Sequence, residues 1–289
     1  MPLKRIRRRL AGLLMALACL PAQAADPTLL RVGGDPNYRP YHYLAEDGTP
    51  QGFDVAVMRA IARERWLDPR FEFGEWGRML DRLEHGGVDA VPMFVSEDRA
   101  LRFRFSRPFL RRHHVLYGRR GLQVGTPDQL AGRRVAVQFG GMAWEWLINE
   151  QANAVLRPMN DEAAALAAVA AGNADFALLP SDIAERALAA GDLGDVQAVG
   201  PPWLERNYAF GVNPARPELV AELDAGLQAI EASGELARLQ QQWLQPAAAK
   251  AAKAKAEPLP VWLPMVPVAL VLLGALVFVL RRNAAAGRD

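Results

Sequence analysis

Apolar and polar positions follow one another along the chain in stretches that predict strands and helices in turn. Between Phe53 and Trp66 the apolar side chains recur every three or four positions, which is typical of an amphipathic helix. Short apolar runs such as Leu30 to Gly33 predict buried strands, and Asp47-Gly48 predicts a hairpin turn. Further strands are expected at 71–73, 88–93, 135–137, 155–158, 176–179 and 208–212, and further helices at 79–84, from 142, 161–171, 181–190, 217–232 and 235–243. This alternation predicts an α/β fold with parallel sheets covered by helices on both faces.

A much longer apolar stretch lies near the end of the chain. The 22 residues 259–280 contain no charged side chain and are followed by Arg281-Arg282. A helix of this length extends about 33 Å, which is enough to cross a hydrocarbon core of about 30 Å. The stretch therefore predicts a single transmembrane helix, with the paired arginines and the tail 281–289 on the cytoplasmic side.

The start of the chain has the pattern of a signal peptide. Basic residues between Lys4 and Arg9 precede an apolar stretch, and Ala22-Gln23-Ala24 provides a small-residue cleavage site. Residues 1–24 are therefore expected to be removed. Cys19 raises the alternative of a lipidated cysteine, but the leucine expected three positions before it is missing. Since Cys19 is the single cysteine, the mature chain is expected to have no disulfide and no cysteine metal site.

These two segments predict the organisation of the whole chain. Residues 25–245 form an exported domain, 246–258 form an Ala/Lys/Pro linker, and 259–280 anchor the domain in the inner membrane with the domain in the periplasm. The exported part and its flanks differ in charge, because the signal peptide, linker and tail hold eleven of the 34 basic residues. The domain keeps 23 basic against 30 acidic residues, so nucleic acid is not an expected partner.

Motifs that carry catalytic chemistry are missing from the sequence. It contains no Gly-x-Ser-x-Gly, no His-Glu-x-x-His and no P-loop. His113 and His114 are neighbours on an expected strand, where adjacent side chains point to opposite faces, so they are not expected to share a metal ion. We therefore expect no catalytic residues, no metal and no cofactor.

Several motifs resemble the bacterial extracellular solute-binding proteins of family 3, the amino-acid-binding type of periplasmic binding protein. The motifs occur in the order of the family and span nearly all of residues 27–245: Leu30 to Tyr41, Gly52-Phe53-Asp54, Gly87-Val88-Asp89-Ala90, Ser96-Glu97-Asp98-Arg99, Phe105-Ser106-Arg107-Pro108-Phe109, Leu130 to Val137, and Ser233-Gly234-Glu235-Leu236 with Trp243. Each motif is weak alone, but seven in sequence are a strong signal.

The resemblance implies a two-lobed clamp that closes on a small solute, the type II periplasmic binding fold. Lobe one would comprise 27–114 and 207–245, and lobe two 115–206. Strands near His114 to Gly118 and Tyr208 to Val212 would form the hinge. A solute in the cleft contacts both lobes only when they close, so its binding shifts an equilibrium between open and closed forms.

The resemblance also implies the solute-binding residues. Arg99 would grip a ligand carboxylate with two hydrogen bonds, although a solvated surface arginine is the alternative. Asp35 and Tyr38 would contact the ligand from the first loop, next to Tyr41, and Trp76 would form a second aromatic wall; packing in the core is the alternative for the aromatic residues.

Three departures from the family pattern bear on the ligand. The usual serine-rich stretch is replaced by Pro92 to Val95, which brings Phe94 into the site, and the usual Gly-Ser/Thr turn is replaced by Gly140-Gly141-Met142. Backbone N–H groups at Gly141 and Met142 can still bind a carboxylate at a helix start. Pro180 stands where the family has the acid that binds the α-ammonium. Asp182 is a candidate replacement, although an acid in the first turn of a helix needs no ligand. A carboxylate with an apolar or aromatic body is the expected solute.

Two binding functions remain open, and one catalytic function is a remote alternative. The domain would deliver solute to an inner-membrane permease for ABC-type transport, or it would be the ligand-sensing subunit of a signalling system whose output domain is on another chain. Cyclohexadienyl dehydratases share the fold and use a poised carboxylic acid in the cleft, but no spacing in this sequence is diagnostic of that chemistry.

Overall fold

The computed structural model of the protein describes residues 26–191 and 193–245. The signal peptide predicted at 1–24, the linker at 246–258, the membrane helix at 259–280 and the tail at 281–289 lie outside the described residues. Within the described part of the chain, no helix has both the length and the apolar character needed to span a membrane.

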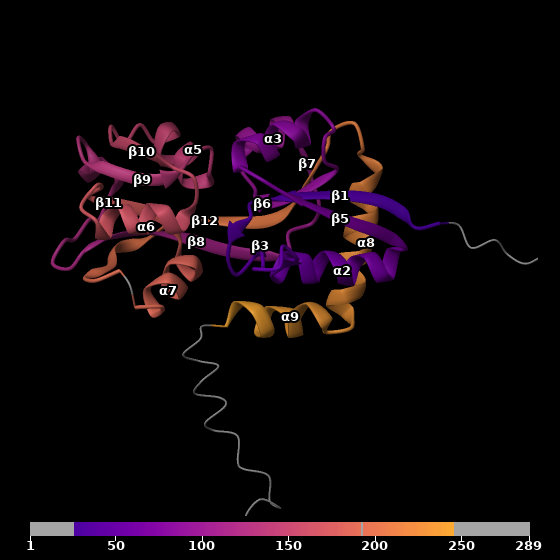
Figure 1. The fold of residues 1–289 in the computed structure, drawn as a ribbon. Helices are drawn as coiled ribbons and strands as arrows, with labels where there is room; N and C mark the ends of the chain where they lie inside the picture. The colour runs from indigo at the N-terminus through magenta and orange to yellow at the C-terminus, as the bar shows by residue number, and fades with distance from the viewer. Residues whose placement is uncertain (1–25, 192, 246–289) are drawn as a thin grey trace, which may run out of the picture.

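Strands and helices alternate along the described chain, as the hydrophobic pattern predicts (Figure 1). The strands are β1 (Thr28–Gly34), β2 (Asn37–Tyr38), β3 (His42–Leu44), β4 (Pro50–Gln51), β5 (Leu67–Phe73), β6 (Ala90–Phe94), β7 (Arg104–Phe105), β8 (Leu110–Arg119), β9 (Arg134–Gln138), β10 (Val155–Met159), β11 (Phe176–Pro180) and β12 (Val196–Val212). The helices are α2 (Phe53–Arg65), α3 (Trp76–Glu84), α4 (Glu97–Arg102), the 3-10 helix η2 (Pro127–Leu130), α5 (Met142–Asn149), α6 (Glu162–Ala170), α7 (Ser181–Ala189), α8 (Glu218–Ala232) and α9 (Glu235–Leu244).

Most strands belong to one continuous sheet with the order β10-β9-β11-β8-β12-β6-β1-β5, and β7 pairs with β12. Strands β5, β1 and β6 are parallel, and so are β10, β9 and β11. The prediction of parallel strands is confirmed for these two groups. It is wrong for β8 and β12, which pair antiparallel with each other and with β11 and β6. These two strands run in opposite directions between the two groups, so the complete sheet is mixed.

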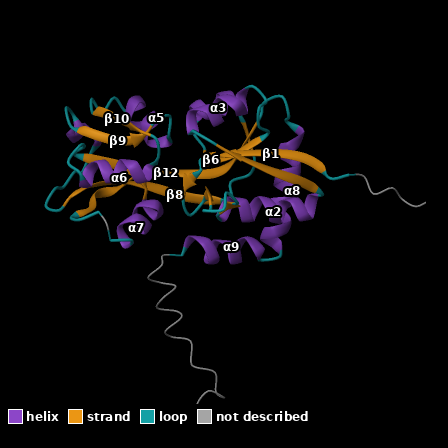
Figure 2. Cartoon of the chain, viewed as in Figure 1, coloured by secondary structure: helices purple, strands orange, loops and turns teal. Residues whose placement is uncertain are grey.

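The elements form two lobes joined by β8 and β12 (Figure 1). We call lobe 1 the part that holds β1, β5 and β6 with α2, α3, α8 and α9, and lobe 2 the part that holds β9 to β11 with α5, α6 and α7. Helices cover both faces of the strands in each lobe (Figure 2). Strands β2, β3 and β4 form a small separate sheet, and the predicted hairpin turn at Asp47-Gly48 connects β3 to β4.

Helix α2 shows why the sequence folds in this way near the site. Its apolar side chains at Phe53, Val57, Met58 and Ile61 are fully buried, at the helical spacing that the sequence predicts. The residue before the helix is Gly52, with a φ of 121°. A Cβ atom at Gly52 would lie 2.3 Å from the carbonyl oxygen of Tyr41, so only glycine lets α2 begin this close to the loop that carries the aromatic residues of the site.

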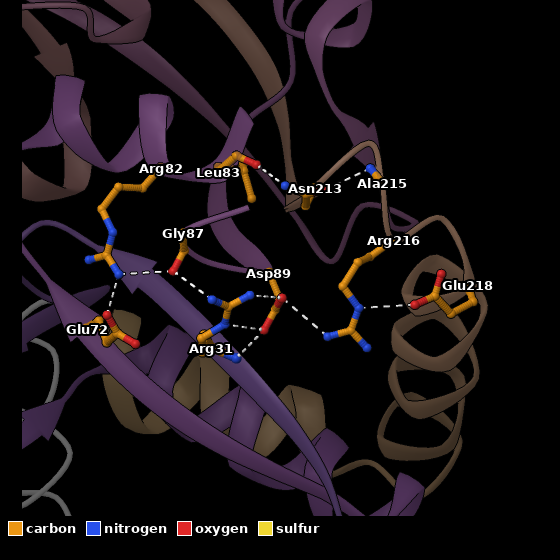
Figure 3. A network of polar contacts seen from close by, with 10 residues as sticks. All are labelled: Arg31, Glu72, Arg82, Leu83, Gly87, Asp89, Asn213, Ala215, Arg216 and Glu218. Carbon is orange, nitrogen blue, oxygen red and sulfur yellow. Dashed lines mark hydrogen bonds and ion pairs between the residues drawn. The ribbon is translucent and has the colours of Figure 1, made fainter. Parts of the chain in front are cut away.

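The buried side chain of Asp89 connects strands β1 and β6 of lobe 1 (Figure 3). Asp89 precedes β6 and accepts hydrogen bonds from the backbone and the guanidinium of Arg31 on β1, at 2.7 and 2.8 Å. Arg216 lies 3.2 Å from the same carboxylate. Lobe 2 repeats the arrangement, because Asp175 before β11 accepts from the backbone and the side chain of Arg134 on β9 at 2.8 and 2.7 Å. These two aspartates therefore stabilise the sheets of the two lobes.

The last helix contacts both lobes. Arg63 on α2 pairs with Glu235 on α9 at 2.7 Å within lobe 1. At the other end of α9, the carbonyl oxygen of Trp243 accepts a hydrogen bond of 3.0 Å from Arg186 on α7 of lobe 2. The end of the described chain, Gln245, thus lies directly after a contact between the lobes.

Candidate functional site

A small cavity of about 20 Å³ lies where the two lobes meet. Lobe 1 contributes side chains from β2, β3, α3, β6 and α4, lobe 2 contributes side chains from β9, α5 and α6, and the crossing strands add one residue each. The lining residues are Tyr38, His42, Trp76, Pro92, Met93, Phe94, Arg99, His114, Gln138, Gly141, Met142, Glu162 and Tyr208. An apolar, largely aromatic lining with a few polar groups is typical of a small-molecule site.

Arg99 is the cation of this cavity, and its side chain is only 2% exposed. The hydroxyl of Ser96 caps α4 by accepting the backbone N–H of Arg99 at 3.2 Å, which places the side chain at the start of the helix. Its Nε donates to Glu145 of lobe 2 at 3.0 Å. Its two Nη atoms donate to the carbonyl oxygens of Phe94 and Gly140 at 3.2 Å each. The guanidinium therefore connects the lobes through a carboxylate that the protein itself supplies.

Trp76 contacts the same turn of lobe 2. Its indole Nε1 donates to the carbonyl oxygen of Gly140 at 2.9 Å. Its ring lies 5.5 Å from the guanidinium carbon of Arg99, which is within the range of a cation–π contact. The side chain of Glu75 caps α3 at this point by accepting the N–H groups of Gly77 and Arg78, both at 2.9 Å. Trp76 thus forms a wall of the cavity and a link between the lobes.

A second set of polar contacts, which includes the lining residue Gln138, also joins the lobes. Asp35 follows β1 and accepts from the side chain of Gln138 in lobe 2 at 2.7 Å. The neighbouring Asn37 donates from its backbone to Asp35 and from its side chain to Asp161, at 2.7 and 2.9 Å. Burial is the main reason that the pKa of Asp35 is raised, although both hydrogen bonds oppose the rise. Asn37 thus links an acid of lobe 1, Asp35, with an acid of lobe 2, Asp161.

Glu162 is the acid of lobe 2 that lines the cavity. It is the first residue of α6, after Asp161, which caps the helix by accepting the N–H of Ala164 at 2.7 Å. Its side chain is only 4% exposed, and its Oε2 is buried without a hydrogen-bond partner. Burial, helped by the nearby charges of Asp35 and Asp161, raises the pKa of Glu162 to about 8. At neutral pH this carboxyl group therefore keeps its proton.

Two histidines complete the polar lining. The Nδ1 of His42 lies 2.7 Å from Asp54 Oδ2, which also accepts the hydroxyl of Tyr208 at 2.7 Å. His114 lies on β8 with its Nδ1 3.3 Å from the carbonyl oxygen of Leu204. Burial lowers the pKa of His114 to about 3, so this imidazole is neutral and offers no positive charge to a ligand. In the described part of the chain, no group of three or more metal-binding side chains is present.

The structure gathers most of the sequence-predicted residues at this cavity. Tyr38, Trp76, Phe94, Arg99, Gly141 and Met142 line it. Asp35, Tyr41 and Asp182 are not part of the lining. The hydroxyl of Tyr41 donates to Asp182, and Arg112 lies 3.4 Å from the same carboxylate, so these groups have partners within the protein. The ligand-binding roles of all nine residues stay predictions.

Seven lining residues were not among the predicted site residues: His42, Pro92, Met93, His114, Gln138, Glu162 and Tyr208. Pro92 and Met93 belong to the apolar stretch that the sequence singled out, so five were missed altogether. A signal was available for two of them. Gln138 is the last residue of β9 and Glu162 follows β10 closely, and ligands of α/β sheets bind beyond the carboxyl ends of the strands. The others reach the cavity through pairing and packing between segments far apart in the chain.

The fold and the cavity define a class of protein, the two-lobed α/β binding proteins whose site lies between the lobes. Residues 30–246 match the bacterial extracellular solute-binding proteins, family 3. The chain belongs to this family.

Curated relatives in the family bind amino acids. The L-cystine-binding protein TcyJ of Escherichia coli (strain K12) is 22% identical over 218 residues, which cover 74% of this chain and 82% of that protein. The L-arginine-binding protein of Pseudomonas aeruginosa is 23% identical over 245 residues, which cover 81% and 94%. Among solved structures, a histidine kinase sensor domain with similarity to periplasmic binding proteins matches with a TM-score of 0.72 and 28% identity, over 76% of this chain and 97% of that chain.

Proposed function

We propose that this domain binds a small amino-acid-like solute in the cavity between its lobes and that Arg99 takes the carboxylate of the solute. The observation that carries the proposal is the position of Arg99. Its buried guanidinium bonds to Phe94 in lobe 1 and to Glu145 and Gly140 in lobe 2. A group that reaches both lobes couples whatever it binds to the closure of the clamp.

The contacts of Arg99 also describe how a solute enters. Glu145 presents a carboxylate to Nε of Arg99, so a solute carboxylate has to displace it or share the guanidinium with it. The body of the solute would lie against the aromatic rings of Tyr38, Trp76 and Phe94 and the side chain of Met142, which supports an apolar or aromatic body. The matched family and its curated relatives are solute-binding proteins, and we propose binding without chemical conversion.

The proposed setting is the periplasm, with transport as the purpose. The family is extracellular and the relatives bind amino acids, which supports delivery of solute to an ABC-type permease. The signal peptide at 1–24 and the membrane anchor at 259–280, both argued from sequence alone, would hold the domain at the outer face of the inner membrane. Anchoring would keep the domain near its membrane partner and raise its local concentration there.

A second function, ligand sensing, is favoured by the match to the histidine kinase sensor domain. The hydrogen bond from Arg186 to Trp243 also supports sensing, because a movement of lobe 2 would displace α9, the helix that precedes the linker. In this case closure would be passed to a partner chain that carries the output domain.

The test of solute binding is calorimetry on the full chain in detergent micelles, with the twenty standard amino acids, aromatic carboxylates and dicarboxylates as probes. We expect a saturable solute whose affinity falls at least about tenfold in Arg99→Lys, because a lysine ammonium cannot form the paired hydrogen bonds of a guanidinium. Arg102→Lys is the matched control, since Arg102 lies on the same helix in an exposed pair with Glu84. Equal affinity in Arg99→Lys and wild type would show that Arg99 does not bind the solute.

A further inference from the structure

Glu162 differs from the other buried acids of the described chain. Asp89 accepts from Arg31, Asp54 accepts from Tyr208, and Asp35 accepts from Asn37 and Gln138. Glu162 is buried to the same degree, yet its Oε2 has no partner. Oδ1 of Asp54 also lacks a partner, but Asp54 does not line the cavity, whereas Glu162 does. A buried polar atom left without a hydrogen bond costs stability, so such an atom in a ligand cavity indicates a partner that comes from outside.

The charges around Glu162 define that partner. The charged groups that act on it are Asp35, at the end of β1, and Asp161, directly before it on α6, and both are acids. From lobe 1 the phenol ring of Tyr38 lies close enough for Glu162 to raise the pKa of its hydroxyl, although burial is the larger cause, and His42 lines the same cavity. The cation of the cavity, Arg99, is already bonded to Glu145. The charged groups that act on Glu162 are thus acids, which favours a positively charged partner for it.

We propose that Glu162 binds a cationic nitrogen of the solute, so that the solute is a zwitterion with its carboxylate at Arg99 and its ammonium group at Glu162. The inference rests on the proposed function and deepens it. An ionised Glu162 would accept from the ammonium group, and the face of the Tyr38 ring would add a cation–π contact. Glu162 would take the role of the ammonium-binding acid, which the family has at the position of Pro180. Asp182, the candidate from sequence, is bonded to Tyr41 and Arg112 instead.

Such binding has to release a proton. Glu162 holds its proton at neutral pH, and an ammonium ligand favours the ionised carboxylate. Near pH 7 we therefore expect the release of about one proton for each zwitterion bound. A solute that touches only Arg99 gives no such release from Glu162.

The experiment compares matched ligands on the full chain in detergent micelles. Each standard amino acid is tested beside its des-amino acid, which keeps only the carboxylate, and its decarboxylated amine, which keeps only the nitrogen. Calorimetry in phosphate and in Tris at pH 7 gives both affinity and proton release. The variants are Glu162→Gln, which keeps the size of the side chain, Arg99→Lys, and Glu150→Gln, a control at an exposed glutamate of lobe 2.

We expect an amino acid to bind at least about tenfold more tightly than its des-amino acid, with this preference and the proton release lost in Glu162→Gln and kept in Glu150→Gln. If the des-amino acid binds wild type as tightly as the amino acid does, or if Glu162→Gln keeps the preference, the role of Glu162 is refuted. In that case, loss of binding in Arg99→Lys would still support the proposed function, in which Arg99 binds the carboxylate of the solute. If the amine alone binds and the carboxylate alone does not, the role of Arg99 fails and that of Glu162 holds. Absence of binding by every compound overturns both.

Discussion

At the scale of single residues, the partner of a buried acid decides whether the acid is charged. Burial alone would raise the pKa of Asp89, but the hydrogen bonds from Arg31 and Arg216 outweigh burial and lower it. Asp89 is therefore ionised, and its contribution to stability is lost as the pH falls through that lowered pKa. Glu162 has no such cation, and its raised pKa gives the opposite dependence on pH.

We expect Glu162→Gln to be more stable than wild type at pH 7.5 and equally stable at pH 4. In the unfolded chain Glu162 ionises near its ordinary pKa of 4.5, whereas in the folded protein it keeps its proton up to about pH 8. Wild-type stability therefore falls as the pH rises between these values, by at most about 1.4 kcal/mol per pH unit. The amide removes this part of the pH dependence.

Unfolding temperatures measured from pH 4 to 8.5 check this, with Glu150→Gln as the control. The comparison with wild type isolates Glu162 from Asp35, whose raised pKa contributes in the same direction in both proteins. A Glu162→Gln protein that unfolds below the wild-type temperature at pH 7.5 would contradict the expectation.

Individual residues of the cavity could be predicted from sequence only where a motif marked them. Arg99 follows the Ser96 cap in a motif of the family, and the structure places it in the cavity. Glu162 carried no such mark, because an acid in the first turn of a helix is ordinarily explained by the helix dipole and by exposure to water. Its burial depends on contact between the lobes, which the local pattern of residues does not encode.

At the scale of elements, helix α5 of lobe 2 carries the carboxylate that links it to lobe 1, and we call this link the clasp. It begins after Gly141, and Glu145 lies one turn into it. From there the carboxylate of Glu145 reaches Arg99 and Ser96 of lobe 1 at 3.0 and 3.3 Å. The side chain of Glu145 is 20% exposed, against 2% for Arg99, so solvent can enter from the side of α5.

We expect Glu145→Gln to raise the affinity for carboxylate solutes by about threefold to tenfold. The amide removes the charge that competes for Arg99 and weakens the clasp, so a larger fraction of the protein is open and able to take up solute. Calorimetry with the tightest solute of the panel measures the change, and Glu150→Gln, at the end of α5, is the control. Unchanged or weaker affinity would show that Glu145 does not compete with the solute.

The order and type of the elements were largely predictable, because their apolar residues follow the helical or strand period closely. Helix α2 was expected to end at Trp66, and it ends at Arg65. Strand β12 was expected only from Tyr208, although it begins at Val196. Its first half contains Gly200, Pro201 and Pro202, which are turn residues by local propensity, and pairing with β8 overrides that propensity.

At the scale of the whole molecule, the two crossing strands connect the lobes (Figure 1). Strand β12 shifts register against β8 between Ala198 and Leu204, within lobe 2. The alternation of strands and helices predicted parallel sheets, and the resemblance to the family implied two crossing strands, but neither predicted that these strands pair antiparallel. Pairs such as Leu204 with His114 bring together residues that are distant in the chain, and no local pattern reports them.

The choice between transport and sensing belongs to this scale. For transport, scrambling the order of residues 246–258 at constant length should leave solute uptake unchanged, because a tether needs length and not a particular sequence. Uptake of the labelled solute by cells that carry the scrambled chain measures this. Retained solute binding with abolished solute-dependent output of a partner would instead establish sensing through a rigid connection.

The hydrogen bond from Arg186 to Trp243 couples the position of Gln245, the last described residue, to the position of lobe 2. Helix α9 is held to lobe 1 by the pair of Arg63 with Glu235, and its last turn is held to lobe 2 by Arg186. Any rotation of lobe 2 about β8 and β12 must either break that second bond or pull Gln245 along an arc. A change of angle inside the clamp is thereby converted into a displacement at the point where the chain leaves it.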